Sequence, residues 1–155
     1  MPDERDIRII EPSQEVFDIY GYYESIIRRA LPDAKIKLIG SFAVPMKGNS
    51  ELDVLIETNN VEEAQDTLIR EGFSKGPIVD GEGFSINREY DIICEAHIVP
   101  FDHKKIKRYE FLIHKLQREE ELRKRYEDLK TKLDGSSSEV YKEEKNRFLE
   151  DNGLI

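Results

Sequence analysis

The sequence predicts an α+β fold: a small mixed β-sheet with helices packed on one face, followed by a C-terminal helical extension. Apolar, β-rich runs occupy residues 35–39, 51–57 and 84–100, and apolar residues recur at helical spacing in the segments around them. From residue 103 onward the segments show helical spacing only. A chain of 155 residues is expected to form one domain, with residues 1–102 as an α/β part and residues 103–155 as the C-terminal helices.

The first predicted elements are an extended segment and a long helix. Residues 1–12 contain the apolar run IRII and end at Pro12. Ser13 is a good helix N-cap, and the helix is expected to run to about Ala30, where Leu-Pro-Asp follows and ends it. The apolar residues at helical spacing that define this helix are Val16, Phe17, Ile19, Tyr20, Tyr23, Ile26 and Ile27.

A second helix is expected after the second apolar run, over residues 61–71. Asn60 precedes it as a cap, and Gly72 follows it as a terminator. The next segment, residues 73–83, is rich in turn residues and has room for a short strand.

The remaining chain reads as one strand region and three helices. Residues 84–100 fit either one long strand or a hairpin, for which Asn87-Arg88 is a candidate break. Ser138 is a candidate N-cap for the last helix, after the loop Gly-Ser-Ser-Ser. The three helices are expected over residues 103–117, 118–133 and 138–151.

Charge and hydropathy limit the classes of function. The net charge is −9, and the first 102 residues carry 10 Lys and Arg against 21 Asp and Glu, whereas the rest carry 14 against 12. Nucleic acid is therefore not expected as a partner, since non-specific binding needs a net basic surface. No apolar run reaches the length of about 18 residues that a membrane span needs. The opening MPDERDIRII lacks the basic and apolar regions of a signal peptide, so a cytoplasmic location is expected.

The most informative stretch is AKIKLIGSFAVPMKGNSELDVLIE, residues 34–57. Its first strand meets the small pair Gly40-Ser41, and after a loop the second strand carries Glu51 and Asp53. Side chains alternate between the faces of a strand, so the two acids share one face, together with Leu55. Adjacent carboxylates repel each other unless a cation neutralises them. Mg²⁺, bound by one or two carboxylates and by phosphate oxygens, is the usual cation.

This stretch resembles the signature of the DNA polymerase β-like nucleotidyltransferase superfamily, in which a hydrophobic strand, Gly-Ser, a spacer and an acid-x-acid strand follow in order. Gly40-Ser41, Glu51-Leu52-Asp53 and Val54-Leu55-Ile56 match that order. Within the superfamily, IGSFAVP is similar to an I-G-S-T-A-V-P-like segment of the GrpB family. The opening IRIIEPSQEVF and the closing EELRKRYEDLKTKL and YKEEKNRFLE also resemble that family. The resemblance covers most of the chain and implies a nucleotidyltransferase-type sheet.

The resemblance implies roles for the matching residues. Gly40 lets the backbone approach a phosphate, and the Ser41 hydroxyl can donate to phosphate oxygens. Glu51 and Asp53 would be catalytic carboxylates that bind Mg²⁺ or Mn²⁺. Many members of the superfamily have Asp at the first of these positions and GrpB relatives often have an aliphatic residue there, so only Asp53 carries over from GrpB. The loop MKGNSE stands where GrpB members tend to show G-L-A-A-K-P, which makes Lys47 the candidate for a phosphate-binding lysine.

The superfamily places a third carboxylate on a neighbouring strand, and this chain offers two candidates. In YDIICEAHIV, Asp91, Glu95 and His97 share one face of the expected strand, and this alternation does not choose between the two acids. Both are candidate catalytic residues, and the expected metal ligands are Glu51, Asp53 and Asp91. GrpB sequences tend to have His-x-His in this strand. Glu95-Ala96-His97 occupies that place, so His97 is a candidate nucleotide-binding residue.

The expected function is a GrpB-like nucleotidyltransferase that transfers a nucleoside monophosphate from an NTP to a small-molecule acceptor with Mg²⁺. The resemblance does not identify the acceptor. One alternative is a domain of the same fold that binds a nucleotide without turnover, which Glu51 favours. Another is a protein-interaction domain, based on the charged helical segment 103–151. The sequence contains no Walker loop, zinc-type Cys/His cluster or G-x-G-x-x-G motif.

Overall fold

The computed structural model describes residues 6–155. The predicted extended segment, residues 1–12, lies partly outside this range. Within it, β1 (Ile9–Ile10) pairs antiparallel with β3 (Gly48–Asn49), so the start of the chain is joined to the loop that follows the Gly-Ser pair. The expected cytoplasmic location is inferred from residues 1–10, and half of these also lie outside the described range.

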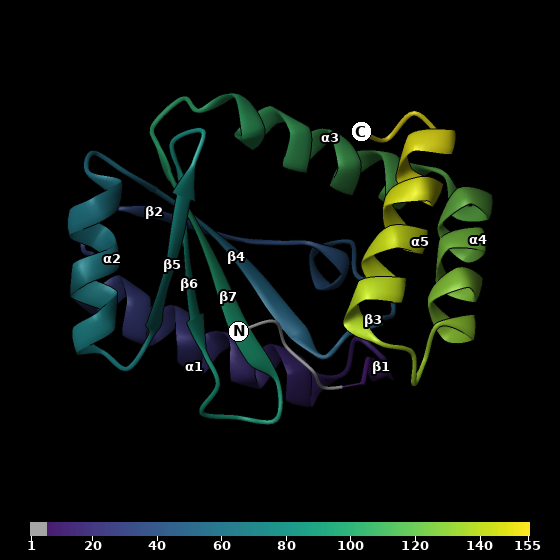
Figure 1. Cartoon of the computed structure of the whole chain (residues 1–155), viewed down its shortest axis with the longest axis horizontal. Coiled ribbons are helices and arrows are strands. Elements are labelled where there is room, and N and C mark those ends of the chain that lie inside the picture. Colours follow the sequence, from purple (N-terminus) through teal and green to yellow (C-terminus); the bar gives the residue numbers. More distant parts are fainter. Residues whose placement is uncertain (1–5) are drawn as a thin grey trace.

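A five-stranded sheet forms the centre of the molecule (Figure 1), in the order β2-β4-β7-β6-β5. β4 and β7 pair in parallel, and the other neighbours pair antiparallel, so the predicted mixed sheet is confirmed. The strands are β2 (Lys35–Ile39), β4 (Glu51–Thr58), β5 (Ser74–Val79), β6 (Glu82–Asn87) and β7 (Ile93–Pro100).

The stretch 84–100 forms two strands and is therefore a hairpin rather than one long strand. β6 ends at Asn87, whose side-chain Oδ1 accepts a hydrogen bond from the Glu89 backbone N–H at 2.9 Å. Such a side-chain turn offers the backbone an alternative to the ladder, so the break falls where Asn87-Arg88 predicted it. The turn-rich segment before it supplies β5, the short strand for which the sequence left room.

α1 (Gln14–Ala30) and α2 (Val61–Arg70) cover one face of the sheet, as predicted (Figure 1). Ser13 and Asn60 are the N-cap residues, and the Asn60 side chain accepts from the Glu63 N–H at 3.0 Å. The core on this face includes the inward residues of β4 and β7 and the apolar stripe of α1: Val16, Tyr23, Ile26, Ile27, Leu52, Val54, Ile56, Cys94, Ala96 and Ile98.

The C-terminal helices lie on the other side of the sheet. α3 (Lys104–Arg118) packs on the opposite face at one end, where Ile113 joins Ile39, Leu55 and Val99 in a second core cluster. α4 (Glu120–Lys132) and α5 (Ser138–Asp151) pack against the loop after β2, in a third cluster that includes Met46. The cap of α5 is Ser137 rather than the predicted Ser138, because the Ser137 side chain accepts from the Val140 N–H. None of the described helices combines the length and apolarity needed to cross a membrane.

Candidate functional site

Gly40 directly follows β2 and lies beside Asp53, the second acid of β4. Ile39 pairs with Asp53 in the β2–β4 ladder, so the chain leaves the strand at the level of this carboxylate. Gly40 has a φ of +78°, and a Cβ at this position would lie 2.6 Å from Asp53 Oδ2. Glycine alone fits both the left-handed backbone and this close approach. The Gly40-Ser41 turn and the Asp53 carboxylate are therefore in contact.

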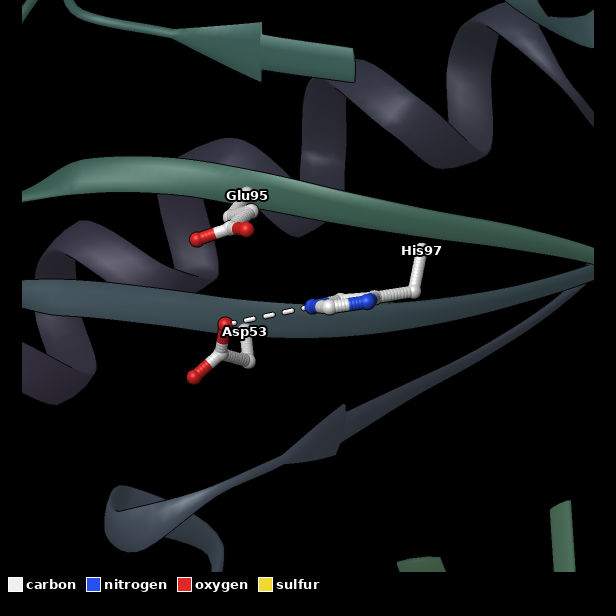
Figure 2. Close-up of side chains that lie close together, drawn as sticks. All are labelled: Asp53, Glu95 and His97. Carbon is white, nitrogen blue, oxygen red and sulfur yellow. Dashed lines mark hydrogen bonds and ion pairs between the residues drawn. The ribbon is translucent and has the colours of Figure 1, made fainter. Parts of the chain in front are cut away.

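Two side chains of β7 join Asp53. Glu95 pairs with Asp53 across the parallel β4–β7 ladder, and His97 follows on the same face. One potential ligand atom from each of the three residues lies within 4.8 Å of the others. Figure 2 shows the three side chains side by side, with His97 Nε2 at 3.2 Å from Asp53 Oδ1.

Glu51 adds a third carboxyl group beside those of Asp53 and Glu95. We refer to Glu51, Asp53 and Glu95 as the acidic row. Glu51 shares a hydrogen bond with Glu95, which requires a proton on one of the two groups. Burial, followed by the charges of Glu95 and Asp53, raises the pKa of Glu51 to about 8. Burial and the Asp53 charge also raise the pKa of Glu95. The row therefore holds more negative charge than its surroundings compensate, and one proton is retained at neutral pH.

His97 connects the acidic row to a second, compensated cluster. Its Nδ1 lies 3.0 Å from Glu82 Oε1, and Glu82 is only 5% exposed. The Glu82 carboxylate also accepts from the Tyr109 hydroxyl at 3.0 Å and from the Lys105 ammonium. We refer to Glu82, His97, Lys105 and Tyr109 as the Glu82 cluster. It fixes the orientation of the imidazole that faces Asp53.

The pKa shifts follow from these contacts. Burial alone would lower the pKa of His97, but the hydrogen bonds with Asp53 and Glu82 outweigh burial and raise it to about 9. Burial alone would raise the pKa of Glu82, but the hydrogen bonds from His97, Lys105 and Tyr109 outweigh it and lower the pKa to about 2. At neutral pH His97 is an imidazolium between two carboxylates.

Lys130 of α4 contacts the side chain of Ser41. The Lys130 ammonium donates to Ser41 Oγ and, at 3.2 Å, to the Lys47 carbonyl oxygen. It also lies 4.2 Å from the centroid of the Tyr126 ring. Lys130 is 1% exposed, so a positive charge is buried directly behind the Gly40-Ser41 turn.

A cavity of about 250 Å³ opens in front of the turn. Gly40, Ser41, Asp53 and His97 form its polar floor, and Lys145 of α5 lines it from the other side. Lys145 and Ser41 also line a smaller cavity beside Glu51. The apolar wall is supplied by the C-terminal helices and includes Tyr109, Leu112, Ile113, Leu116, Tyr126 and Leu149. The site is thus polar at the sheet and apolar at the helices.

Two of the expected site residues lie elsewhere. Asp91 is exposed in the loop before β7, which begins only at Ile93, so the alternation along a strand does not extend to it. It lines a second cavity of about 450 Å³, which Glu51 also lines. The Lys47 ammonium lies 3.5 Å from Glu11 at the surface, and of Lys47 only the backbone approaches the site. Of the two candidate third carboxylates, Glu95 lies beside Asp53. The lysine ammonium that contacts the turn is that of Lys130.

Sequence reasoning missed Glu82, and it placed Lys130 only among the lysines of the closing helices that could line a cleft. Glu82 stood in a turn-rich segment, where an acid is normally solvated, and nothing in its neighbours along the chain indicates three donors. Lys130 is one of many charged residues in the α4 sequence. It matches the closing-helix pattern of the family that the sequence resembles, and it follows the buried Tyr126 by four residues, so the two share a helix face.

The carboxyl groups fit a divalent cation. Glu51, Asp53 and Glu95 supply hard oxygen donors. The raised pKa values of Glu51 and Glu95 indicate an excess of negative charge that a cation would relieve. His97 would support such a site, because it fixes one oxygen of Asp53 from the side of the Glu82 cluster.

Comparison with solved structures supports the fold. The GrpB protein from Enterococcus faecalis matches with a TM-score of 0.75 at 17% identity, over 94% of this chain and 92% of that one. Two structures of the Cid1 poly(U) polymerase, bound to MgGTP and to Mg 3′-dATP, match with TM-scores of 0.51 and 0.52 at 16% identity. Each match covers 75% of this chain. The matched part is 41% of the first Cid1 chain and 40% of the second. The predicted nucleotidyltransferase-type fold is confirmed.

Among curated proteins, none matches this sequence. The family model described as GrpB protein, in contrast, matches residues 6–152, which is nearly the whole chain. The motifs around Gly40-Ser41 and Asp53 lie inside this match, so the resemblance read from them is confirmed. The chain belongs to the GrpB family.

Proposed function

We propose that this protein is a Mg²⁺-dependent nucleotidyltransferase that transfers a nucleoside monophosphate from an NTP to a small-molecule acceptor. The observation that carries the proposal is the convergence of Glu51, Asp53 and Glu95 beside the Gly40-Ser41 turn, at the polar floor of a cavity. Nucleotidyl transfer needs these parts in one place: carboxylates, an anion-binding turn and space for a nucleotide.

Asp53 and Glu95 are the residues proposed to hold Mg²⁺ or Mn²⁺, with Glu51 completing the acidic group. When bound, the cation would neutralise charge on the phosphate oxygens and support the departure of pyrophosphate. His97 is proposed to position Asp53 rather than to bind phosphate directly, because both of its ring nitrogens already have carboxylate partners.

The phosphate chain is proposed to lie between the Gly-Ser turn and α5. The Ser41 hydroxyl donates to phosphate oxygens, and Gly40 permits the close approach that a side chain would block. Lys145 faces this space from α5 and supplies a positive charge. The apolar wall of the cavity suits the base and ribose of a nucleotide.

The acceptor is proposed to enter beside Glu51. Glu51 lines both the small cavity next to Ser41 and the larger cavity of about 450 Å³. An acceptor hydroxyl in the larger cavity would form a bond from its oxygen to the α-phosphorus as the bond to pyrophosphate breaks. Glu51 is proposed to take the hydroxyl proton, which it could do once a bound cation had displaced the proton that Glu51 and Glu95 share.

We also propose that the α/β part (residues 1–102) and the C-terminal helices (103–155) act as one domain. The cavity is lined by residues from both parts, since its floor comes from β2, β4 and β7 and its wall from α3, α4 and α5. Neither part alone would enclose a nucleotide.

Binding without turnover is the second candidate function. The observation that favours it is the ion pair between Asp53 and His97, which occupies one oxygen of the expected metal ligand. A nucleotide-binding domain of this kind would retain NTP affinity and release no pyrophosphate.

Calorimetric titration with Mg²⁺ and each NTP, followed by a pyrophosphate-release assay, tests the proposal. We expect Mg²⁺-dependent NTP binding, and a loss of that dependence in Asp53→Asn. Asp128→Asn, an exposed change on α4, is the control and should bind like the wild type. Release of pyrophosphate in the presence of an acceptor supports the enzyme, and its absence for every acceptor class supports the binding domain. Unchanged NTP and Mg²⁺ affinity in Asp53→Asn would refute both.

A further inference from the structure

Lys130 is a buried charge that the proposed reaction does not use. It reaches from α4 to the back of the Gly40-Ser41 turn and is 1% exposed. Its contacts are the Ser41 hydroxyl oxygen, the Lys47 carbonyl oxygen and the face of the Tyr126 ring. Within residues 6–155, no carboxylate lies within ion-pair distance of the Lys130 ammonium.

Such a position is unfavourable for an ammonium group. A buried charge without an ion-pair partner loses hydration that neutral acceptors only partly replace. Burial, followed by the charge of Lys145, accordingly lowers the pKa of Lys130 to about 7. A buried leucine or methionine would serve packing better, so packing alone does not explain a lysine here.

While Lys130 is protonated, the direction of its hydrogen bond to Ser41 is fixed by chemistry. An ammonium group has three N–H donors and no acceptor, so Ser41 Oγ must be the acceptor. The hydroxyl hydrogen of Ser41 therefore cannot point at Lys130. Ser41 lines both cavities beside Asp53, and the hydrogen is free to be donated on that side.

We propose that Lys130 is a positioning residue that holds the Ser41 hydroxyl as a donor toward the polyphosphate chain of the substrate. This inference rests on the proposed function, because it assigns a polyphosphate to the cavity in front of Ser41. Lys130 itself does not line that cavity and acts through Ser41. A fixed donor binds an anion without first losing rotational freedom.

A double-mutant cycle tests this role. Affinity for inorganic tripolyphosphate with Mg²⁺ is measured by calorimetry for the wild type, Lys130→Met, Ser41→Ala and the double variant. Loss of one hydrogen bond to a charged group should weaken binding about tenfold or more in each single variant. If Lys130 acts through Ser41, the double variant should be no weaker than the weaker single variant.

Two controls separate this role from folding and from net charge. Lys132→Met removes an exposed lysine from the same helix and should leave the affinity near that of the wild type. Thermal unfolding shows whether each variant is folded, and the cycle is repeated with Lys130→Gln if the Met variant is not. Unfolding of both Lys130 variants would show that the ammonium serves the packing of α4, which overturns the proposal.

Additive losses, about a hundredfold in the double variant, would show that the Lys130 charge acts on the anion independently of Ser41 and would overturn the proposal. Wild-type affinity in Lys130→Met would also overturn it. Neither result would affect the proposed nucleotidyltransferase. Failure of the wild type to bind tripolyphosphate or any NTP would refute both proposals together.

Discussion

Two partly buried charged clusters lie on either side of Asp53, and they differ in how their charge is compensated. In the Glu82 cluster one carboxylate accepts from His97, Lys105 and Tyr109, and its pKa falls to about 2. In the acidic row, Glu51 and Glu95 face each other and Asp53, and the pKa of Glu51 rises to about 8.

The comparison shows which cluster is complete without a ligand. The Glu82 cluster satisfies its charges within the protein, as expected of a structural support. The acidic row does not, as expected of a site whose missing charge is supplied by a cation. Asp53 links the two, because it belongs to the acidic row and contacts His97 of the Glu82 cluster.

The largest effect is expected for Glu82→Gln, which breaks the compensated cluster. The change leaves His97 and Lys105 without their buried carboxylate, and the free energy of unfolding should fall by about 3–5 kcal/mol. Urea denaturation measures this loss. Glu62→Gln, an exposed change on α2, is the control and should shift stability by no more than about 0.5 kcal/mol. A loss below that of the control would mean that the cluster is not a structural support.

The next effect is a pH dependence carried by His97. Its pKa is raised from 6.5 to about 9 in the folded state. The stabilisation that protonated His97 gives the folded state is therefore complete below pH 6.5 and is lost as the pH rises through 9. This change amounts to about 3 kcal/mol. Urea denaturation with a metal chelator should show a loss between these pH values that is larger in the wild type than in His97→Asn. Equal slopes in the two proteins would contradict the assigned charge of His97.

A smaller effect is expected for Gly40→Ala, at the turn that touches Asp53. The new Cβ would lie 2.6 Å from Asp53 Oδ2, and φ is +78°, so the variant should lose about 2 kcal/mol of stability and also its Mg²⁺-dependent NTP binding. Gly135→Ala is a matched control: φ is +82°, but no atom lies within 4 Å of the added Cβ. It should show the backbone strain alone and bind NTP normally. Equal binding in both variants would argue against contact between the turn and the site.

The smallest effect on stability is expected for Glu51→Gln. The amide keeps a donor for the hydrogen bond with Glu95 and removes the charge that burial disfavours, so stability at pH 8 should stay within about 1 kcal/mol of the wild type or rise. Turnover should nevertheless be lost. Urea denaturation and pyrophosphate release measure the two effects. A large destabilisation, like that of Glu82→Gln, would remove the difference between the two clusters.

The sequence by itself determined most of the fold. The spacing of apolar residues predicted α1, β2, β4, α2 and the C-terminal helices within a residue or two, because these patterns are local. The Gly-Ser pair and the acid-x-acid strand indicated the superfamily, and the segment IGSFAVP indicated the GrpB family. Alternation along β4 also placed Glu51 and Asp53 on one face, since both residues lie inside a single regular strand.

Only the tertiary structure decided which partners these residues meet. Glu95 rather than Asp91 joins Asp53 because a side-chain turn at Asn87 delays the start of β7 until Ile93. Lys130 rather than Lys47 supplies the buried charge at Ser41, from a helix 89 positions away in the sequence. Periodicity reports the face on which a side chain lies, whereas the packing of distant elements fixes what stands opposite that face.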